Sequence, residues 1–221
     1  GAVYGFLGPN GAGKTTTIRM LTALLSPTSG SGRVAGASIT DREVLIEHIG
    51  YLPESPPIHE EFTAREQLEY HGGLRNMTPA AISDRIETLL ARFELTDAAD
   101  QRIATYSKGM RQKTGLIQAI MHDPEGVFLD EPTSGLDPRA ARTVRETITN
   151  LAAGDTTVFL STHILPVVDE LADVVGVLHG GRLVAEGTPD GLKRRAETGE
   201  QRSLEDAFLE VTTEETAEPT A

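Results

Sequence analysis

The chain has 221 residues, 38% of them hydrophobic and 24% charged, which fits one globular domain with a substantial core. It contains no cysteine, which excludes disulfide bonds and thiolate metal sites, and no apolar run approaches the roughly 20 residues that a membrane-spanning helix needs. Its net charge of −13 argues against binding to nucleic acids or anionic lipids, because both need a basic surface, and together these features favour a cytoplasmic location.

The first quarter of the chain alternates strand and helix patterns. The apolar run Val3–Leu7, ended by Gly8 and Pro9, is typical of a buried parallel strand. Apolar residues then recur at helical spacing until Pro27. In chain order we predict a helix over residues 14–25, a turn at 30–32, a short helix over 44–49 and a strand at Ile49–Leu52.

From about residue 55 to 123 the patterns are helical, with no convincing strand. Thr63 with Glu66 three residues later is a capping-box signature for a helix start, and Thr78 with Pro79 opens a second helix. A third helix is predicted over residues 108–121. Beyond it we predict strands at 127–129 and 157–160, a helix over 139–151, and a hairpin of 174–178 with 183–185.

These elements define an α/β fold class, with a mostly parallel sheet and an inserted α-helical subdomain. We expect a single domain over residues 1–211, with a core at about 1–54 and 124–211 and a helical subdomain at about 55–123. The acidic, threonine-rich residues 212–221 are predicted to form a disordered tail.

A glycine-rich segment stands between the first predicted strand and helix, and it matches the pattern G-x-x-x-x-G-K-[ST]. Small residues there let backbone N–H groups surround phosphate oxygens at a helix N-terminus. Lys14 would reach the β- and γ-phosphates of a nucleotide, and the hydroxyl of Thr15 would bind Mg²⁺. The predicted nucleotide-binding residues are Gly8, Pro9, Asn10, Gly11, Ala12, Gly13, Lys14, Thr15 and Thr16.

Two carboxylates follow the strand predicted at 127–129. Asp130 would hold Mg²⁺ through water, and Glu131 is placed to activate the nucleophilic water. Alone this pair is weak evidence, since acidic residues commonly follow buried strands. Combined with the glycine-rich loop, it predicts a P-loop NTPase core that binds Mg·ATP and hydrolyses it.

Three further motifs complete a pattern: Tyr-Ser-Lys-Gly-Met-Arg-Gln at 106–112, Ser-Gly-Leu-Asp at 134–137 and Ser-Thr-His at 161–163. In this order the motifs resemble the nucleotide-binding domain of ABC transporters, over essentially the whole chain. The resemblance implies that Asp137 lies in a loop crossing a dimer interface, and that His163 contacts the γ-phosphate and orients Glu131. It also implies a signature motif that caps the nucleotide of the opposite subunit, formed by Ser107, Lys108, Gly109 and Met110.

The sequence departs from the family pattern in three places. Glu54 stands where the family usually has a glutamine that touches Mg²⁺, so a carboxylate would join the metal site. The signature variant resembles that of the exporter branch handling drugs, antibiotics or sodium, as do residues 181–189 and 203–208. By the resemblance, the family's N-terminal antiparallel strands and adenine-stacking aromatic would lie upstream of Gly1, and we do not expect Tyr4 and Tyr51, on predicted core strands, to replace that aromatic.

The resemblance implies two kinds of partner: a second ATPase subunit, identical or related, and integral-membrane permease subunits at the inner face of the cell membrane. Residues 54–66 would line the groove that receives a permease helix, and Phe62 is either a contact there or part of the core. The motifs also leave open an importer subunit of the same family, a non-transport ABC-type ATPase, and a nucleotide-binding regulator without turnover.

The acidic surface also suggests a salt-loving cytoplasm. Only four of the twenty basic residues are lysines, and high salt would screen the self-repulsion of the acidic chain. A GC-rich genome, which favours arginine codons, is the alternative explanation for the scarcity of lysine, and we favour the salt-loving cytoplasm modestly over it.

Overall fold

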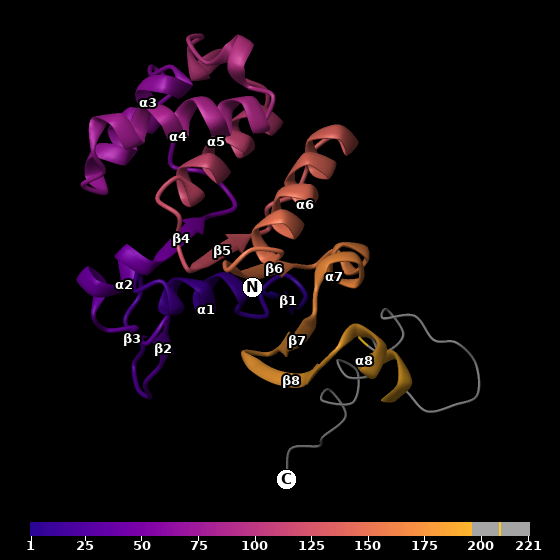
Figure 1. Ribbon diagram of the computed structural model, residues 1–221. Helices are drawn as coiled ribbons and strands as arrows, with labels where there is room; N and C mark the ends of the chain where they lie inside the picture. The colour runs from indigo at the N-terminus through magenta and orange to yellow at the C-terminus, as the bar shows by residue number, and fades with distance from the viewer. Residues whose placement is uncertain (196–207, 209–221) are drawn as a thin grey trace.

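The computed structural model describes residues 1–195 and Phe208, so the predicted tail at 212–221 lies outside the described residues. One sheet has the strand order β4-β5-β6-β1-β7-β8 (Figure 1). Neighbouring strands pair in parallel from β4 to β7, and β8 pairs antiparallel with β7. The strands are β1 (Val3–Leu7), β4 (Ile49–Leu52), β5 (Gly126–Asp130), β6 (Thr157–Thr162), β7 (Val174–His179) and β8 (Arg182–Gly187). The predicted α/β class with a mostly parallel sheet is confirmed.

Helices cover both faces of this sheet, because successive side chains of a strand point to opposite sides. Phe128 of β5 packs with Ile18 of α1, whereas its neighbours Val127 and Leu129 belong to the cluster that contains Val144 of α6. The elements flanking the sheet are α1 (Lys14–Leu21), β2 (Arg33–Val34), β3 (Ala37–Ser38), α2 (Arg42–His48), α6 (Pro138–Ala152), α7 (Leu165–Leu171) and α8 (Pro189–Arg195).

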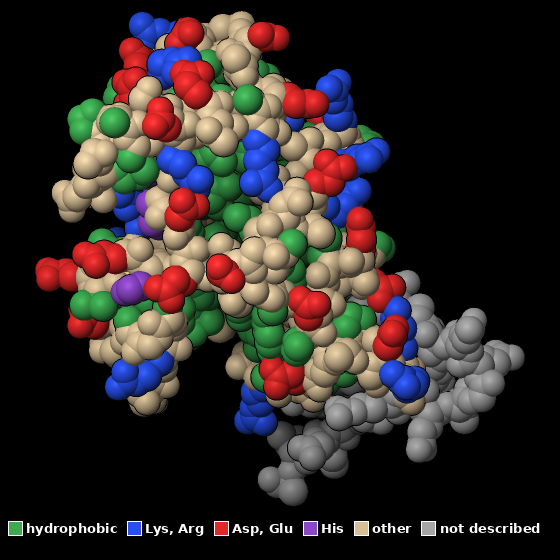
Figure 2. All heavy atoms as spheres, viewed as in Figure 1, with side chains coloured by type: hydrophobic (Ala, Val, Ile, Leu, Met, Phe, Trp, Pro, Cys, Tyr) green, Lys and Arg blue, Asp and Glu red, His purple; other side chains and the backbone are tan. Residues whose placement is uncertain are grey.

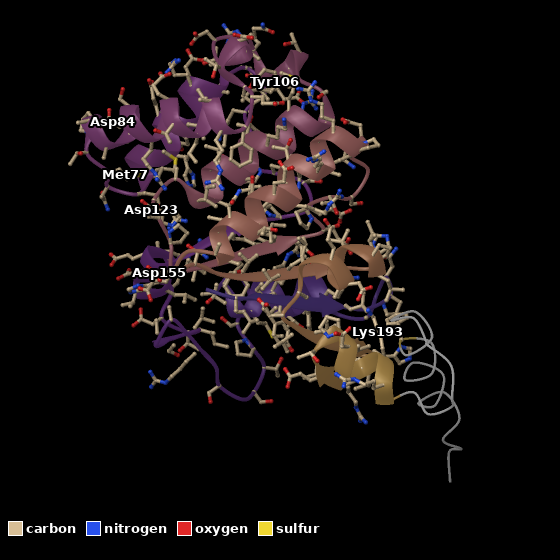
Figure 3. All side chains as sticks on the ribbon, turned by 45° about the vertical axis from the view of Figure 1, so that its right-hand side comes forward. Met77, Asp84, Tyr106, Asp123, Asp155 and Lys193 are labelled. Atoms are coloured by element: carbon tan, nitrogen blue, oxygen red, sulfur yellow. The ribbon has the colours of Figure 1, made fainter. Side chains whose placement is uncertain are left out.

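A helical layer lies above the sheet in Figure 1 and contains α3 (Ala64–Leu74), α4 (Pro79–Arg92), η1 (Thr96–Ala98), η2 (Ile103–Thr105) and α5 (Lys108–Ile120). Thr63 caps α3 and shares a complete capping box with Glu66, as predicted. In Figure 3, Tyr106 lies within this layer, whereas Asp155 lies beside the sheet. The subdomain boundaries at 54 and 124 stay a prediction.

Asp and Glu side chains are spread over both the helical layer and the core on the face that Figure 2 shows, with Lys and Arg side chains between them. None of the helices in the described part of the chain combines the length and the apolar character that crossing a bilayer requires.

The first helix is shorter than predicted, ending at Leu21 and not at residue 25. The Thr22 hydroxyl donates to the carbonyl of Ile18 at 2.9 Å, and Ala23 takes a left-handed backbone with φ of 53°, which turns the chain out of the helix. The β2–β3 hairpin and the helices α7 and α8 were not predicted.

Candidate functional site

The glycine-rich loop after β1 and the first turn of α1 form one side of a cavity of about 340 Å³. Gly11 and Gly13 have φ values of 83° and 106°, a backbone that glycine adopts without steric cost. A Cβ atom on Gly8 would lie 2.5 Å from the carbonyl oxygen of Leu178, so the close contact between the loop and β7 leaves no room for a side chain at this position. Of the predicted loop, Asn10, Gly11, Gly13, Lys14, Thr15 and Thr16 line the cavity, and Glu54, Glu131, Ser134 and His163 complete it.

Glu131 lies directly after β5 and is only 7% exposed. Its φ of 50° is left-handed, which costs a non-glycine residue roughly 1 kcal/mol and is typical of functional sites. Its backbone N–H donates to the carbonyl of Ser161 at 3.0 Å, and its Oε2 accepts from the Thr162 hydroxyl at 3.1 Å. Nδ1 of His163 lies 2.9 Å from Oε1. The end of β6 therefore holds this carboxylate in place from two sides.

Lys14 brings a positive charge to the same carboxylate. The residue is 6% exposed, and Nζ donates to the carbonyls of Gly8 at 2.8 Å and Pro9 at 3.2 Å. The same Nζ lies 3.4 Å from Oε1 of Glu131. A phosphate group in the cavity would compete with Glu131 for this ammonium group, because both are anions.

The predicted metal ligands differ in their access to the cavity. Thr15 and Glu54 line it, whereas Asp130 is 1% exposed, accepts from the Ser161 hydroxyl at 2.5 Å and is not among the lining residues. Among the described residues, no group of three or more His, Asp or Glu side chains could hold a metal ion by itself. The hydroxyl of Thr15 and the carboxylates of Glu54 and Asp130 nevertheless suit Mg²⁺, which is commonly bound by one or two carboxylates together with substrate phosphates.

The signature residues lie outside this cavity. Ser107 caps α5, its hydroxyl accepting from the backbone N–H of Met110 at 3.2 Å, and both Ser107 and Lys108 are exposed. A Cβ atom on Gly109 would lie 3.6 Å from Oδ2 of Asp137, so the starts of α5 and α6 are close neighbours. None of Ser107, Lys108, Gly109 and Met110 lines the cavity beside the glycine-rich loop of the same chain.

Asp137 caps α6 and is also absent from the cavity wall. Its Oδ1 accepts from the backbone N–H groups of Ala140 and Arg139 at 3.0 Å each, and these hydrogen bonds hold the pKa of the carboxyl below its ordinary value. The side chain is exposed, so it is open to a partner as well as to its own helix.

The structure adds two residues to which the motifs alone gave no role. Ser134 lines the cavity, and Thr162 donates to Glu131. Both residues belong to sequence motifs, at 134–137 and 161–163, and this membership was the sequence feature that could have predicted their roles. Phe62 is half-buried and outside the core clusters; it stacks on His59 with ring centroids 5.0 Å apart and meets Tyr70 edge-on at 6.2 Å.

Sequence comparison identifies relatives of the chain. The profile of the family described as "ABC transporter" matches residues 1–134. The chain is 42% identical over 203 residues to the Daunorubicin resistance ATP-binding protein DrrA3 of Streptomyces coeruleorubidus, covering 91% of this chain and 64% of that protein. It is 39% identical over 197 residues to the Bacitracin transport ATP-binding protein BcrA of Bacillus licheniformis, covering 88% of this chain and 63% of that protein.

Structural comparison agrees. A solved structure described as "Structure of ATP binding subunit of ABC transporter" matches with a TM-score of 0.86 and 33% identity, covering 96% of this chain and 88% of the other. Because the family profile matches more than half of the chain, the chain belongs to the ABC transporter family, as its motifs indicated. The chain spans just under two thirds of the length of the two curated relatives.

Proposed function

We propose that the chain binds Mg·ATP in the cavity beside the glycine-rich loop and hydrolyses it, with Glu131 as the general base. The observation that carries this proposal is the setting of Glu131: its carboxylate lies at the cavity wall, 2.9 Å from Nδ1 of His163 and 3.4 Å from Nζ of Lys14. A general base must lie within hydrogen-bond reach of the proton that it removes, and here the base is oriented by a second group.

The other residues of the cavity take the roles of binding and charge neutralisation. Backbone N–H groups of the loop and the N-terminus of α1 would bind the phosphates, and Lys14 would neutralise the terminal ones. The Mg²⁺ ion supplies further neutralisation of the phosphate charge when bound, and Thr15, Asp130 and Glu54 would hold it. Glu54 in place of an amide adds a negative charge, which favours the metal and opposes the phosphates.

We propose further that two copies, or two related subunits, share their sites head to tail. The position of the signature residues supports this: Ser107 and Lys108 are exposed and do not line the cavity of their own chain. The N-terminus of α5 is a favourable place for the γ-phosphate of another subunit, because its backbone N–H groups attract anions. Asp137, close to Gly109, would lie in the same interface.

The proposed partners of this ATPase pair are integral-membrane permease subunits, with the chain held at the cytoplasmic face of the cell membrane. Two relatives carry the words "Daunorubicin resistance" and "Bacitracin transport" in their names, which supports export of a drug or antibiotic. The aromatic group of His59, Phe62 and Tyr70 supports residues 54–66 as the docking region, because Tyr70 is 49% exposed and Phe62 half-buried.

The experiment that tests this proposal compares Glu131→Gln with Glu125→Gln, a change at an exposed carboxylate that pairs with His48. We expect Glu131→Gln to keep nucleotide binding, to lose turnover, and to accumulate an ATP-bound dimer in size-exclusion chromatography. Glu125→Gln should retain wild-type turnover. Wild-type turnover in Glu131→Gln would refute the assigned role, and binding without turnover in the unaltered chain would favour a regulator.

A further inference from the structure

The hydroxyl of Tyr51 is buried and has no hydrogen-bond partner among the described residues. Burial raises the pKa of this hydroxyl, and Arg19 of α1 lies close enough that hydrogen bonding and its charge both act to lower it, although the contact does not reach hydrogen-bond geometry. A guanidinium group only donates, so in either case the proton of the Tyr51 hydroxyl has no acceptor. Leaving a buried hydroxyl unpaired costs about 1–3 kcal/mol, so the position calls for a physical explanation.

The sheet register places Tyr51 beside Asp130. Tyr51 on β4 pairs with Phe128 on β5, and Asp130 stands two residues further along β5, so both side chains point to the same face of the sheet. This is the face that packs against α1, whose first turn carries Thr15. Burial is the main cause that raises the pKa of Tyr51, and the charge of Asp130 raises it further, as expected of two close neighbours.

Asp130 already has one donor, and it comes from the opposite side. Ser161 on β6 donates to Oδ1 of Asp130 at 2.5 Å, whereas Tyr51 stands on β4, and β5 lies between these two strands. A carboxylate accepts several hydrogen bonds, but the last torsion angle of an aspartate side chain is broad. The Ser161 hydroxyl therefore fixes only one oxygen of the Asp130 carboxylate. A second donor on the other side of β5 would fix the plane of the carboxylate as well.

We propose that Tyr51 is a positioning residue for the metal-binding carboxylate: in the nucleotide-loaded site its hydroxyl donates to Asp130 and, with Ser161, fixes the carboxylate toward Mg²⁺. This inference rests on the proposed function, since it takes Asp130 as a residue that holds the metal. Groups that hydrogen-bond a metal-binding side chain typically change metal affinity about 10-fold or more when they are removed.

The test uses two variants that each remove one hydroxyl and keep the ring. Tyr51→Phe removes the proposed donor, and Tyr4→Phe is the matched control. Tyr4 lies in the same row of the sheet, because the strand registers link Tyr51 through Phe128 and Phe159 to Tyr4. Its hydroxyl donates to Glu186 at 2.7 Å. Binding of a fluorescent ATP analogue is measured in EDTA and then across a Mg²⁺ titration. Thermal unfolding without nucleotide is measured in parallel.

We expect Tyr51→Phe to bind the analogue in EDTA as the unaltered chain does, but to need about 10-fold more Mg²⁺ for half of the metal-dependent gain in affinity. Its melting temperature without nucleotide should be unchanged or higher, since an unpaired buried hydroxyl is lost. Tyr4→Phe should follow the unaltered chain in the Mg²⁺ titration.

The outcomes separate this inference from the proposed function. If the unaltered chain gains affinity with Mg²⁺ and Tyr51→Phe follows the same titration curve, the inference is overturned and the proposed function stands. An equal loss of affinity with and without Mg²⁺ would also overturn it, because that result indicates a packing role. If the unaltered chain binds no nucleotide, or gains nothing from Mg²⁺, both proposals fail.

Discussion

Nδ1 of His163 lies 2.9 Å from Oε1 of Glu131, and this contact joins the ends of two neighbouring strands. A carboxylate only accepts hydrogen bonds, so Nδ1 carries the proton and Nε2 is left for another partner. Glu131 is almost fully buried, whereas the His163 side chain is 45% exposed. The histidine therefore holds a largely buried carboxylate in place, and both side chains line the cavity.

Replacing His163 should uncouple this carboxylate from the nucleotide. We expect His163→Ala to lower ATP turnover about 10²-fold or more, because the base loses its orienting group. Nucleotide affinity should change little, since the glycine-rich loop is intact. His48→Ala is the control, because His48 pairs with exposed Glu125 at 2.7 Å, away from the cavity. Steady-state turnover and equilibrium binding measure the two effects, and equal turnover in both variants would contradict the role of His163.

A site shared between two copies makes a sharp prediction for mixed variants. Lys14→Ala and Ser107→Arg should each be inactive alone. In a mixed dimer one site carries both changes and the other carries neither, so a one-to-one mixture should recover roughly a quarter of the wild-type rate. A mixture as inactive as its components would contradict the head-to-tail arrangement.

Two buried histidines predict a loss of stability in mild acid. Burial is the main cause that lowers the pKa of His71 and of His122 to about 4, and the positive charge of Arg75 lowers both further. In the unfolded chain these two imidazoles therefore bind protons below about pH 6.5, whereas in the folded chain they stay neutral down to about pH 4. The free energy of unfolding should fall as pH drops through this window, by up to about 1.4 kcal/mol per pH unit for each histidine.

Urea unfolding at a series of pH values measures this effect. His71→Gln should flatten the dependence between about pH 6.5 and 4 relative to the unaltered chain. Because carboxyl groups also titrate near the lower end, the difference between variant and unaltered chain is the quantity to compare. An unchanged slope in His71→Gln would show that this histidine is not the cause.

The acidic surface predicts a dependence on salt. With a net charge of −13, self-repulsion opposes the compact state, and salt shortens its range from about 10 Å at 0.1 M to about 3 Å at 1 M. We expect the melting temperature to rise by several degrees between about 0.1 and 1 M potassium chloride. A melting temperature independent of salt would favour the codon-usage explanation of the scarce lysines.

The strands of the main sheet were predicted more accurately than the short helices and the β2–β3 hairpin. Val3–Leu7 and Ile49–Leu52 have the predicted bounds, because each is an apolar run ended by glycine or proline. The helix Leu165–Leu171 was missed because seven residues give too short a periodic pattern, although Pro166 in its first turn was a usable signal. The first helix ends early because the backbone turns at Ala23, and no local sequence pattern predicted this turn.

The sequence predicted the members of the candidate site better than their geometry. Lys14, Glu131 and His163 were all expected, and the structure brings them together. The left-handed backbone of Glu131 and its contact with Thr162 depend on the β5–β6 register, which no local pattern encodes. The unpaired hydroxyl of Tyr51 likewise follows from burial between the sheet and α1, and only the folded chain reveals it.

The central claim is that the chain hydrolyses ATP in a site built from two subunits, and the most direct measurement is the Mg·ATP hydrolysis rate against protein concentration. We predict a rate that rises faster than linearly and is absent in Lys14→Ala. The absence of turnover at every concentration, while nucleotide still binds, would contradict the claim.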